Sequence, residues 1–113
     1  MSKLTGKPIF YNKAKRALVE TYNRRSKIGL VGEWINVETG EWTNTDSHIS
    51  GAIDSYYEYL LKCAVLFRDP DCKRMWQQSI AAINKYLADK VTRQETVLKG
   101  VTGNPELWFG HAD

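Results

Sequence analysis

Apolar residues recur at helical spacing in three stretches of this chain. The first spans residues 8–25, with Pro8 at the position that proline favours and lysines and arginines on the opposite face. The second runs from Ser50, a suitable cap, to about residue 68 and is apolar on almost every side, as is typical of a buried helix. The third begins at Asp69-Pro70-Asp71, which supplies a cap, a first-turn proline and an acidic first turn. Its apolar face consists of Met75, Trp76, Ser79, Ile80, Ile83, Tyr86 and Leu87. Because almost nothing separates the second helix from the third, we expect them to be antiparallel neighbours.

Strand patterns occur in two places. Residues 34–37 and 41–43 flank a tight turn in which Gly40 is free to adopt a positive φ, which predicts a β-hairpin. Its Trp34 and Trp42 either pack the hairpin on the helices or offer a stacking surface for sugars. Residues 96–98 and 107–109, on either side of Gly103-Asn104-Pro105, predict a second hairpin. The fold class is therefore mainly α with β-hairpins, after a short polar lead over residues 1–7.

Length and composition limit the function classes. A chain of 113 residues forms at most one domain, and 42% hydrophobic and 12% aromatic residues suit a globular core rather than disorder. The net charge of +3 has mixed signs, and the basic residues of the first helix lack a glycine-rich loop or interleaved aromatics. They are therefore a solvated helix face, and we expect no nucleic-acid partner.

The cysteines and histidines form no recognisable metal pattern. Cys63 and Cys72 are spaced neither as a metal knuckle nor as a redox motif, and His48 and His111 lie far apart in the sequence. We expect Cys63 to pack in a core, and the sequence leaves a bridge to Cys72 open. No apolar stretch is long enough to span a membrane, and Met1 does not begin a signal-peptide pattern, so the compartment also stays open.

Two carboxylates stand out in the second helix. Asp54 and Glu58 are four residues apart, so they share one helix face within an apolar and aromatic segment. In one interpretation Asp54 favours the helix dipole and Glu58 pairs with Lys62. In the other, both carboxylates point into a polar cavity lined by Tyr56, Tyr57 or Tyr59. Periodicity alone leaves both interpretations open.

Residues 54–62, Asp-Ser-Tyr-Tyr-Glu-Tyr-Leu-Leu-Lys, resemble the motif of the class I α-mannosidases, glycoside hydrolase family 47. Leu4-Thr5-Gly6 followed by Pro8 and Phe10 is similar to the family's helix entry. Residues 24–30 and 35–42 resemble the next stretch, closest to the ER-degradation-enhancing mannosidase-like branch. The resemblance covers about residues 3–90. Lys7, in place of an acidic cap, and Glu33-Trp34 depart from the pattern.

The resemblance implies a barrel of paired helices, an (αα)7 toroid several hundred residues long. Three helices cannot close such a ring, so we expect residues 1–113 to be a fragment of a single glycoside hydrolase catalytic domain. In the family, one catalytic glutamate lies before the match to Leu4-Thr5-Gly6. Another glutamate and the calcium-holding segment lie well after residue 113.

The implied activity is inverting hydrolysis of α-1,2-linked mannose in N-glycans, with calcium as cofactor. Asp54 is the implied catalytic acid or base and Glu58 the implied substrate-binding residue, with no metal ligand in this chain. The implied partners are a high-mannose glycan or α-mannoside and the remainder of the parent domain, in the endoplasmic reticulum lumen or secreted. Two alternatives are a non-catalytic mannosidase-like glycan-binding protein of glycoprotein quality control and a helical interaction module without sugar chemistry.

Overall fold

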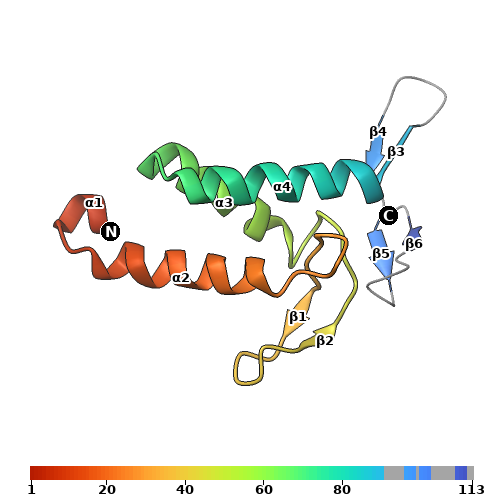
Figure 1. The fold of residues 1–113 in the computed structure, drawn as a ribbon, viewed down its shortest axis with the longest axis horizontal. Coiled ribbons are helices and arrows are strands. Elements are labelled where there is room, and N and C mark those ends of the chain that lie inside the picture. The colour runs from red at the N-terminus through yellow and green to blue at the C-terminus, as the bar shows by residue number, and fades with distance from the viewer. Residues whose placement is uncertain (91–95, 99, 103–108, 112–113) are drawn as a thin grey trace.

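The part of the chain that the structure describes contains four helices and three two-stranded antiparallel sheets (Figure 1). The structure is a computed structural model that describes residues 1–90, 96–98, 100–102 and 109–111, with side chains up to residue 88. The helices are α1 (Ser2–Thr5), α2 (Ile9–Asn23), α3 (Asp54–Phe67) and α4 (Pro70–Tyr86). The strands are β1 (Trp34–Ile35), β2 (Trp42–Asn44), β3 (Ala88–Lys90), β4 (Thr96–Leu98), β5 (Gly100–Thr102) and β6 (Phe109–His111).

The predicted first helix is confirmed as α2, which begins directly after Pro8. Only Tyr22 of this helix is fully buried, since α2 makes few contacts with α3. The polar lead predicted for residues 1–7 is wrong in one respect, because residues 2–5 form the single turn α1. That turn closes when the Leu4 and Thr5 amides donate to the Met1 carbonyl, and it ends at Gly6 in a left-handed conformation.

Helices α3 and α4 form the tightest helix pair, as their short connection predicted. Only Arg68 and Asp69 separate them, and Figure 1 shows them side by side. The cap predicted at Asp69 is confirmed: its Oδ1 accepts from the backbone amides of Asp71 and Cys72, at 2.8 and 3.0 Å. A disulfide between Cys63 and Cys72, with Cα atoms 5.8 Å apart, ties the two helices together at this end.

The cap predicted at Ser50 is wrong. Helix α3 begins four residues later, at Asp54, and has no side-chain cap. The Ser50 carbonyl instead accepts from the amides of Ile53 and Asp54, which closes a turn before the helix, while its hydroxyl lies 2.9 Å from His48 Nδ1. The turn is held by the burial of Ile53, so a core contact rather than a capping side chain sets the start of α3.

The core has two parts along the α3–α4 pair. One lies around the start of α3 and the end of α4, and the other around the disulfide and the inner face of α2. The first contains Leu30, Val31, Ile53, Tyr57, Ala82, Ile83 and Leu87, and the second contains Tyr22, Leu60, Cys63, Cys72 and Met75. Helix α3 therefore buries one face only. Its opposite face leaves Val65 71% and Leu66 54% exposed, so the prediction of a helix buried all round is wrong for this chain.

The first predicted hairpin is confirmed as β1–β2, with Gly40 at φ 76° in its turn. The second is wrong in its pairing. β4, at the predicted residues 96–98, pairs with β3, because the chain leaves α4 at Tyr86 and turns directly into a strand. Phe109 lies in β6, which pairs with β5, while residues 107 and 108 and the Gly103-Asn104-Pro105 turn lie outside the described residues.

Whether these elements belong to a toroid stays a prediction. No helix in the described part of the chain is long and apolar enough to cross a membrane.

Candidate functional site

Asp54 and Glu58 lie one turn apart on the exposed side of α3. Asp54 is the acidic residue of the first turn, where the helix dipole favours negative charge, and its Oδ1 accepts from the Ser55 amide at 2.8 Å. Glu58 Oε2 accepts from Lys62 Nζ at 2.9 Å, so the predicted pair between these residues is present. Both carboxylates face solvent, and their predicted roles toward a sugar stay predictions.

A strained turn lies two residues before Asp54. Ala52 has φ 76°, a left-handed conformation that residues with a Cβ seldom adopt. The next residue, Ile53, is buried in the core. Strain of this kind clusters at functional sites, where the surrounding structure holds the backbone in place. The sequence contains no sign of it, since alanine is not a residue that marks such turns.

The three tyrosines of the motif separate into two environments. Tyr57 is buried and Tyr56 half-buried, and burial raises the pKa of Tyr56 to about 12 and that of Tyr57 further. Their rings meet edge to face, with centroids 5.0 Å apart. Tyr59 alone is on the exposed side of α3. The structure therefore does not bring Tyr56 and Tyr57 together with the two carboxylates, and both rings support the helix from the core side.

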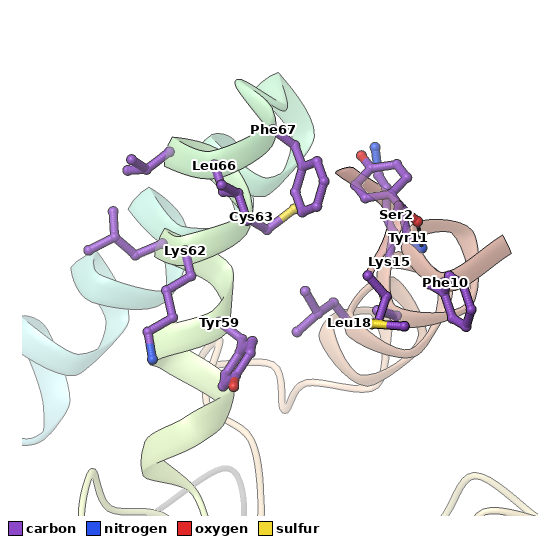
Figure 2. Close-up of a pocket in the computed structure, with 14 residues that line it drawn as sticks. Ser2, Phe10, Tyr11, Lys15, Leu18, Tyr59, Lys62, Cys63, Leu66 and Phe67 are labelled. Atoms are coloured by element: carbon purple, nitrogen blue, oxygen red, sulfur yellow. Dashed lines mark hydrogen bonds between the residues drawn. The ribbon is translucent and has the colours of Figure 1, made fainter. Parts of the chain in front are cut away.

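A wide apolar groove separates α2 from α3 (Figure 2). Its volume is about 670 Å³, and the labelled Leu18 faces Tyr59 across it. Tyr11 and Phe67 also line the groove and pack against each other, with ring centroids 4.5 Å apart. Neither Asp54 nor Glu58 lines it. Sugars need polar groups for their hydroxyls, so this groove is an uncovered packing surface rather than a sugar site.

Asp69 is the most heavily hydrogen-bonded carboxylate that the structure describes. Besides the two amides that it caps, it accepts from the Tyr11 hydroxyl and from Lys15 Nζ, both on α2. Burial alone would raise the pKa of Asp69, but the hydrogen bonds from Lys15, Tyr11 and the Cys72 amide outweigh it and hold that pKa at about 2. Sequence reasoning found the cap and missed Tyr11 and Lys15, which are more than fifty positions away and carry no local signal.

The described residues do not fit a calcium ion. Among them, only Cys63, Asp69 and Cys72 bring three potential ligand atoms within 4.8 Å of one another. Calcium takes six to eight oxygen ligands, whereas these two sulfurs are bonded to each other and the carboxylate is occupied by its donors. The cluster of Cys63, Asp69 and Cys72 is therefore not a calcium site.

Comparison with known proteins agrees with the motif in α3. The profile of glycosyl hydrolase family 47 matches residues 1–111. An α-mannosidase I of Arabidopsis thaliana is 45% identical over 77% of this chain and 14% of its own length. The human ER degradation-enhancing alpha-mannosidase-like protein 2 is 43% identical over 76% of this chain and 15% of its own length. The mouse mannosyl-oligosaccharide 1,2-alpha-mannosidase IB is 35% identical over 98% of this chain and 18% of its own length. The chain thus spans less than a fifth of the length of these relatives.

Proposed function

This chain belongs to glycosyl hydrolase family 47, and from that premise we propose that it is part of an enzyme that hydrolyses α-1,2-linked mannose in N-glycans. The reaction inverts the anomeric centre, and calcium is held by segments beyond residues 1–113. The observation that carries the proposal is Asp54, an exposed first-turn carboxylate two residues after the strained turn at Ala52.

Asp54 is the proposed acid or base. Inverting glycosidases use two carboxyl groups roughly 6.5–9.5 Å apart, so that a water molecule fits between the base and the sugar. Asp54 supplies one of them from the start of a helix that is anchored by Ile53 and Tyr57. The opposing glutamate comes from outside this chain, so residues 1–113 alone do not complete the reaction.

Glu58 is the proposed substrate-binding residue. Its carboxylate is held by Lys62 at 2.9 Å, so the two side chains together present an acceptor and a donor on one exposed face. Sugar hydroxyls both donate and accept, and this pair can satisfy them in either direction. Because such contacts act on the ground state and transition state alike, they affect KM more than kcat.

The Cys63–Cys72 disulfide supports an oxidising compartment. Disulfides persist in the endoplasmic reticulum lumen and outside the cell and are rare in the cytosol. Together with a relative named for ER degradation, this supports placing the protein in the secretory pathway.

A second candidate function is non-catalytic recognition of mannose glycans in glycoprotein quality control. The observation in its favour is the 43% identity to the human ER degradation-enhancing alpha-mannosidase-like protein 2. The two candidates share a glycan ligand and differ in turnover.

Mannose release separates them. Residues 1–111 replace the matching segment of the mouse mannosyl-oligosaccharide 1,2-alpha-mannosidase IB, which is similar over 98% of this chain. Mannose release is measured on an α-1,2-mannobiose substrate for the chimera with and without Asp54→Asn. Asp54→Asn keeps the shape and removes the proton-carrying carboxylate, so the rate should fall by about 10²–10⁴. The control is Asp71→Asn, which changes the exposed first-turn acid of α4 and should leave turnover unchanged. Near-parental turnover by Asp54→Asn would mean that Asp54 only supports the helix. The 113-residue chain by itself should release no mannose.

A further inference from the structure

The structure assigns the two tryptophans of the β1–β2 hairpin to different environments. Trp42 packs on the core around Leu30 and Ile53, and its Nε1 donates to the Arg24 carbonyl at 2.6 Å. Trp34, in the opposite strand, is 59% exposed. Of the two uses that the sequence allows for these rings, packing accounts for Trp42, whereas Trp34 belongs to neither core cluster of the described residues.

A β-bulge turns the two rings apart. Trp34 pairs with Asn44, yet the next residue, Ile35, pairs with Trp42, so one residue of β2, Thr43, is left over. In a regular ladder Asn44 and Trp42 would share a face, and Trp34 would lie on that face too. The bulge instead pairs the half-buried Ile35 with Trp42 on one face of the hairpin and leaves Trp34 exposed on the other face. Bulges re-aim side chains in this way next to functional sites.

Two polar residues, Glu33 and Asn44, neighbour Trp34 along the strand and across the ladder. Asn44, directly across the ladder from Trp34, donates from Nδ2 to Glu33 Oε2 at 2.7 Å. The segment 33–46 carries four carboxylates, at positions 33, 38, 41 and 46, and no lysine or arginine. This charge disfavours nucleic acids and other anions.

The hairpin is fixed relative to the start of α3. Trp42 packs against the same part of the core as Ile53, which directly precedes Asp54. The hairpin that carries Trp34 is therefore packed on the same part of the core as the start of α3, which carries Asp54. The hairpin itself projects away from the helices (Figure 1).

We propose that Trp34, with Glu33 and Asn44 beside it, forms a mannose-stacking subsite that binds the substrate glycan away from the bond that is cleaved. The apolar C–H face of a pyranose lies on the indole, and its hydroxyls donate to the carboxylate and accept from the amide. This inference rests on the proposed function for the identity of the glycan, since the ring and its polar neighbours fit a neutral sugar in general.

The test measures binding of a free high-mannose oligosaccharide to the 113-residue chain by calorimetry. Trp34→Ala should weaken high-mannose binding on the order of tenfold or more, as loss of an aromatic stacking platform does in other binding proteins. Trp34→Phe keeps a ring and should retain most of the affinity. Val37→Ala removes an 87% exposed apolar side chain after the same strand and should leave affinity unchanged.

A second measurement covers the case in which Trp34→Ala disturbs the isolated chain. In the chimera described above, the same substitution should raise KM for the high-mannose glycan with little change in kcat, and it should leave α-1,2-mannobiose kinetics unchanged. Unchanged affinity in the chain together with unchanged KM in the chimera would overturn the subsite. Turnover that depends on Asp54 but not on Trp34 removes this inference alone. Glycan binding that depends on Trp34, in a chimera without turnover, removes the hydrolytic function alone.

Discussion

Asp69 shows how one residue can join two helices, α2 and α4, that are distant in the sequence. Its carboxylate caps α4 through two backbone amides and receives donors from Tyr11 and Lys15 of α2. Because the side chain is buried, the carboxylate loses its hydrogen bonds to water when the chain folds. These donors replace those hydrogen bonds. The same contacts hold its pKa at about 2, below the ordinary value of 3.8.

The stability of the chain should therefore depend on Asp69 at acidic pH. A carboxylate whose pKa is lower in the folded state stabilises the fold above its unfolded pKa, and that contribution disappears as the pH falls from about 4 to about 2. A shift of this size corresponds to roughly 2 kcal/mol. Urea denaturation across this pH range should show the loss in the parent chain, and Asp69→Asn should show a lower stability at pH 7 and a flatter acid limb.

Asparagine is also a good cap, so Asp69→Asn keeps the helix start and removes the charge. The matched control is Asp71→Asn. Asp71 lies on the same turn but is exposed, and its contact with Lys15 Nζ is longer, at 3.3 Å. Its substitution should therefore leave the acid limb in place. An Asp69→Asn chain with the same acid limb as the parent would show that other carboxylates cause the loss.

At the scale of elements, the β1–β2 hairpin depends on a close approach at Gly32. A Cβ at this position would lie 2.4 Å from the Asn44 carbonyl oxygen and 2.9 Å from the Trp42 ring. Neither neighbour is the flexible end of a side chain, so the hairpin would have to move. Gly32→Ala should lower the free energy of unfolding by about 1–3 kcal/mol, as overpacking does.

Gly51→Ala is the matched control for Gly32→Ala. A Cβ there meets nothing within 4 Å, and Gly51 does not have a positive φ. The substitution should be neutral, or stabilising by less than about 1 kcal/mol through the unfolded chain. Equal effects of the two substitutions in urea denaturation would contradict the close packing of the hairpin base.

The α3–α4 pair has a covalent link whose effect can be measured separately. Residues 63 and 72 are nine positions apart, and closing a loop of that length stabilises a fold by about 2–3 kcal/mol in the chain-entropy description. Adding a reductant should lower the denaturation midpoint by a corresponding amount. A chain with Cys63→Ala and Cys72→Ala should start at the lower midpoint and show no response to reductant. A parent chain that does not respond, with both thiols shown to be free, would contradict a stabilising bridge.

These elements also show what could be predicted from the sequence. The Asp69-Pro70-Asp71 start and the Gly40 turn are local chemistry, and both are where the sequence places them. The start of α3 depends on the burial of Ile53, and the partner of β4 depends on where α4 ends. Both are decided by contacts between distant residues, which periodicity cannot report. The bulge that separates Trp34 from Trp42 also cannot be predicted from periodicity. The motif at Asp54 is visible only through its resemblance to a known family.

At the scale of the whole molecule, the chain is much shorter than its family 47 relatives, and one face of α3 is exposed. The chain covers 14–18% of the length of three of its relatives, and one side of its central helix is apolar and uncovered. The same side forms the groove of about 670 Å³ between α2 and α3. Apolar surface of this extent on a small chain favours association or binding of apolar molecules.

The chain should therefore bind an apolar fluorescent dye strongly in its native state, or self-associate. The groove should be the site, because Val65 and Leu66 combine high exposure with a position on its wall. Leu66→Lys adds a charge there in the last turn of α3, where a cation is favourable, so the fold should survive the change. Dye fluorescence, and any oligomer seen by light scattering, should fall in this variant.

Val37→Lys is the matched control, since Val37 is also exposed but lies on the hairpin, away from the groove. It should leave dye binding and association as in the parent chain. A general loss of packing would instead leave dye binding unchanged in both variants, because the dye would then bind disordered apolar segments throughout the chain. A sharp cooperative melt of a dye-free monomer would contradict the prediction itself. It would mean that α2 closes onto α3 in solution and covers the face that the structure leaves open.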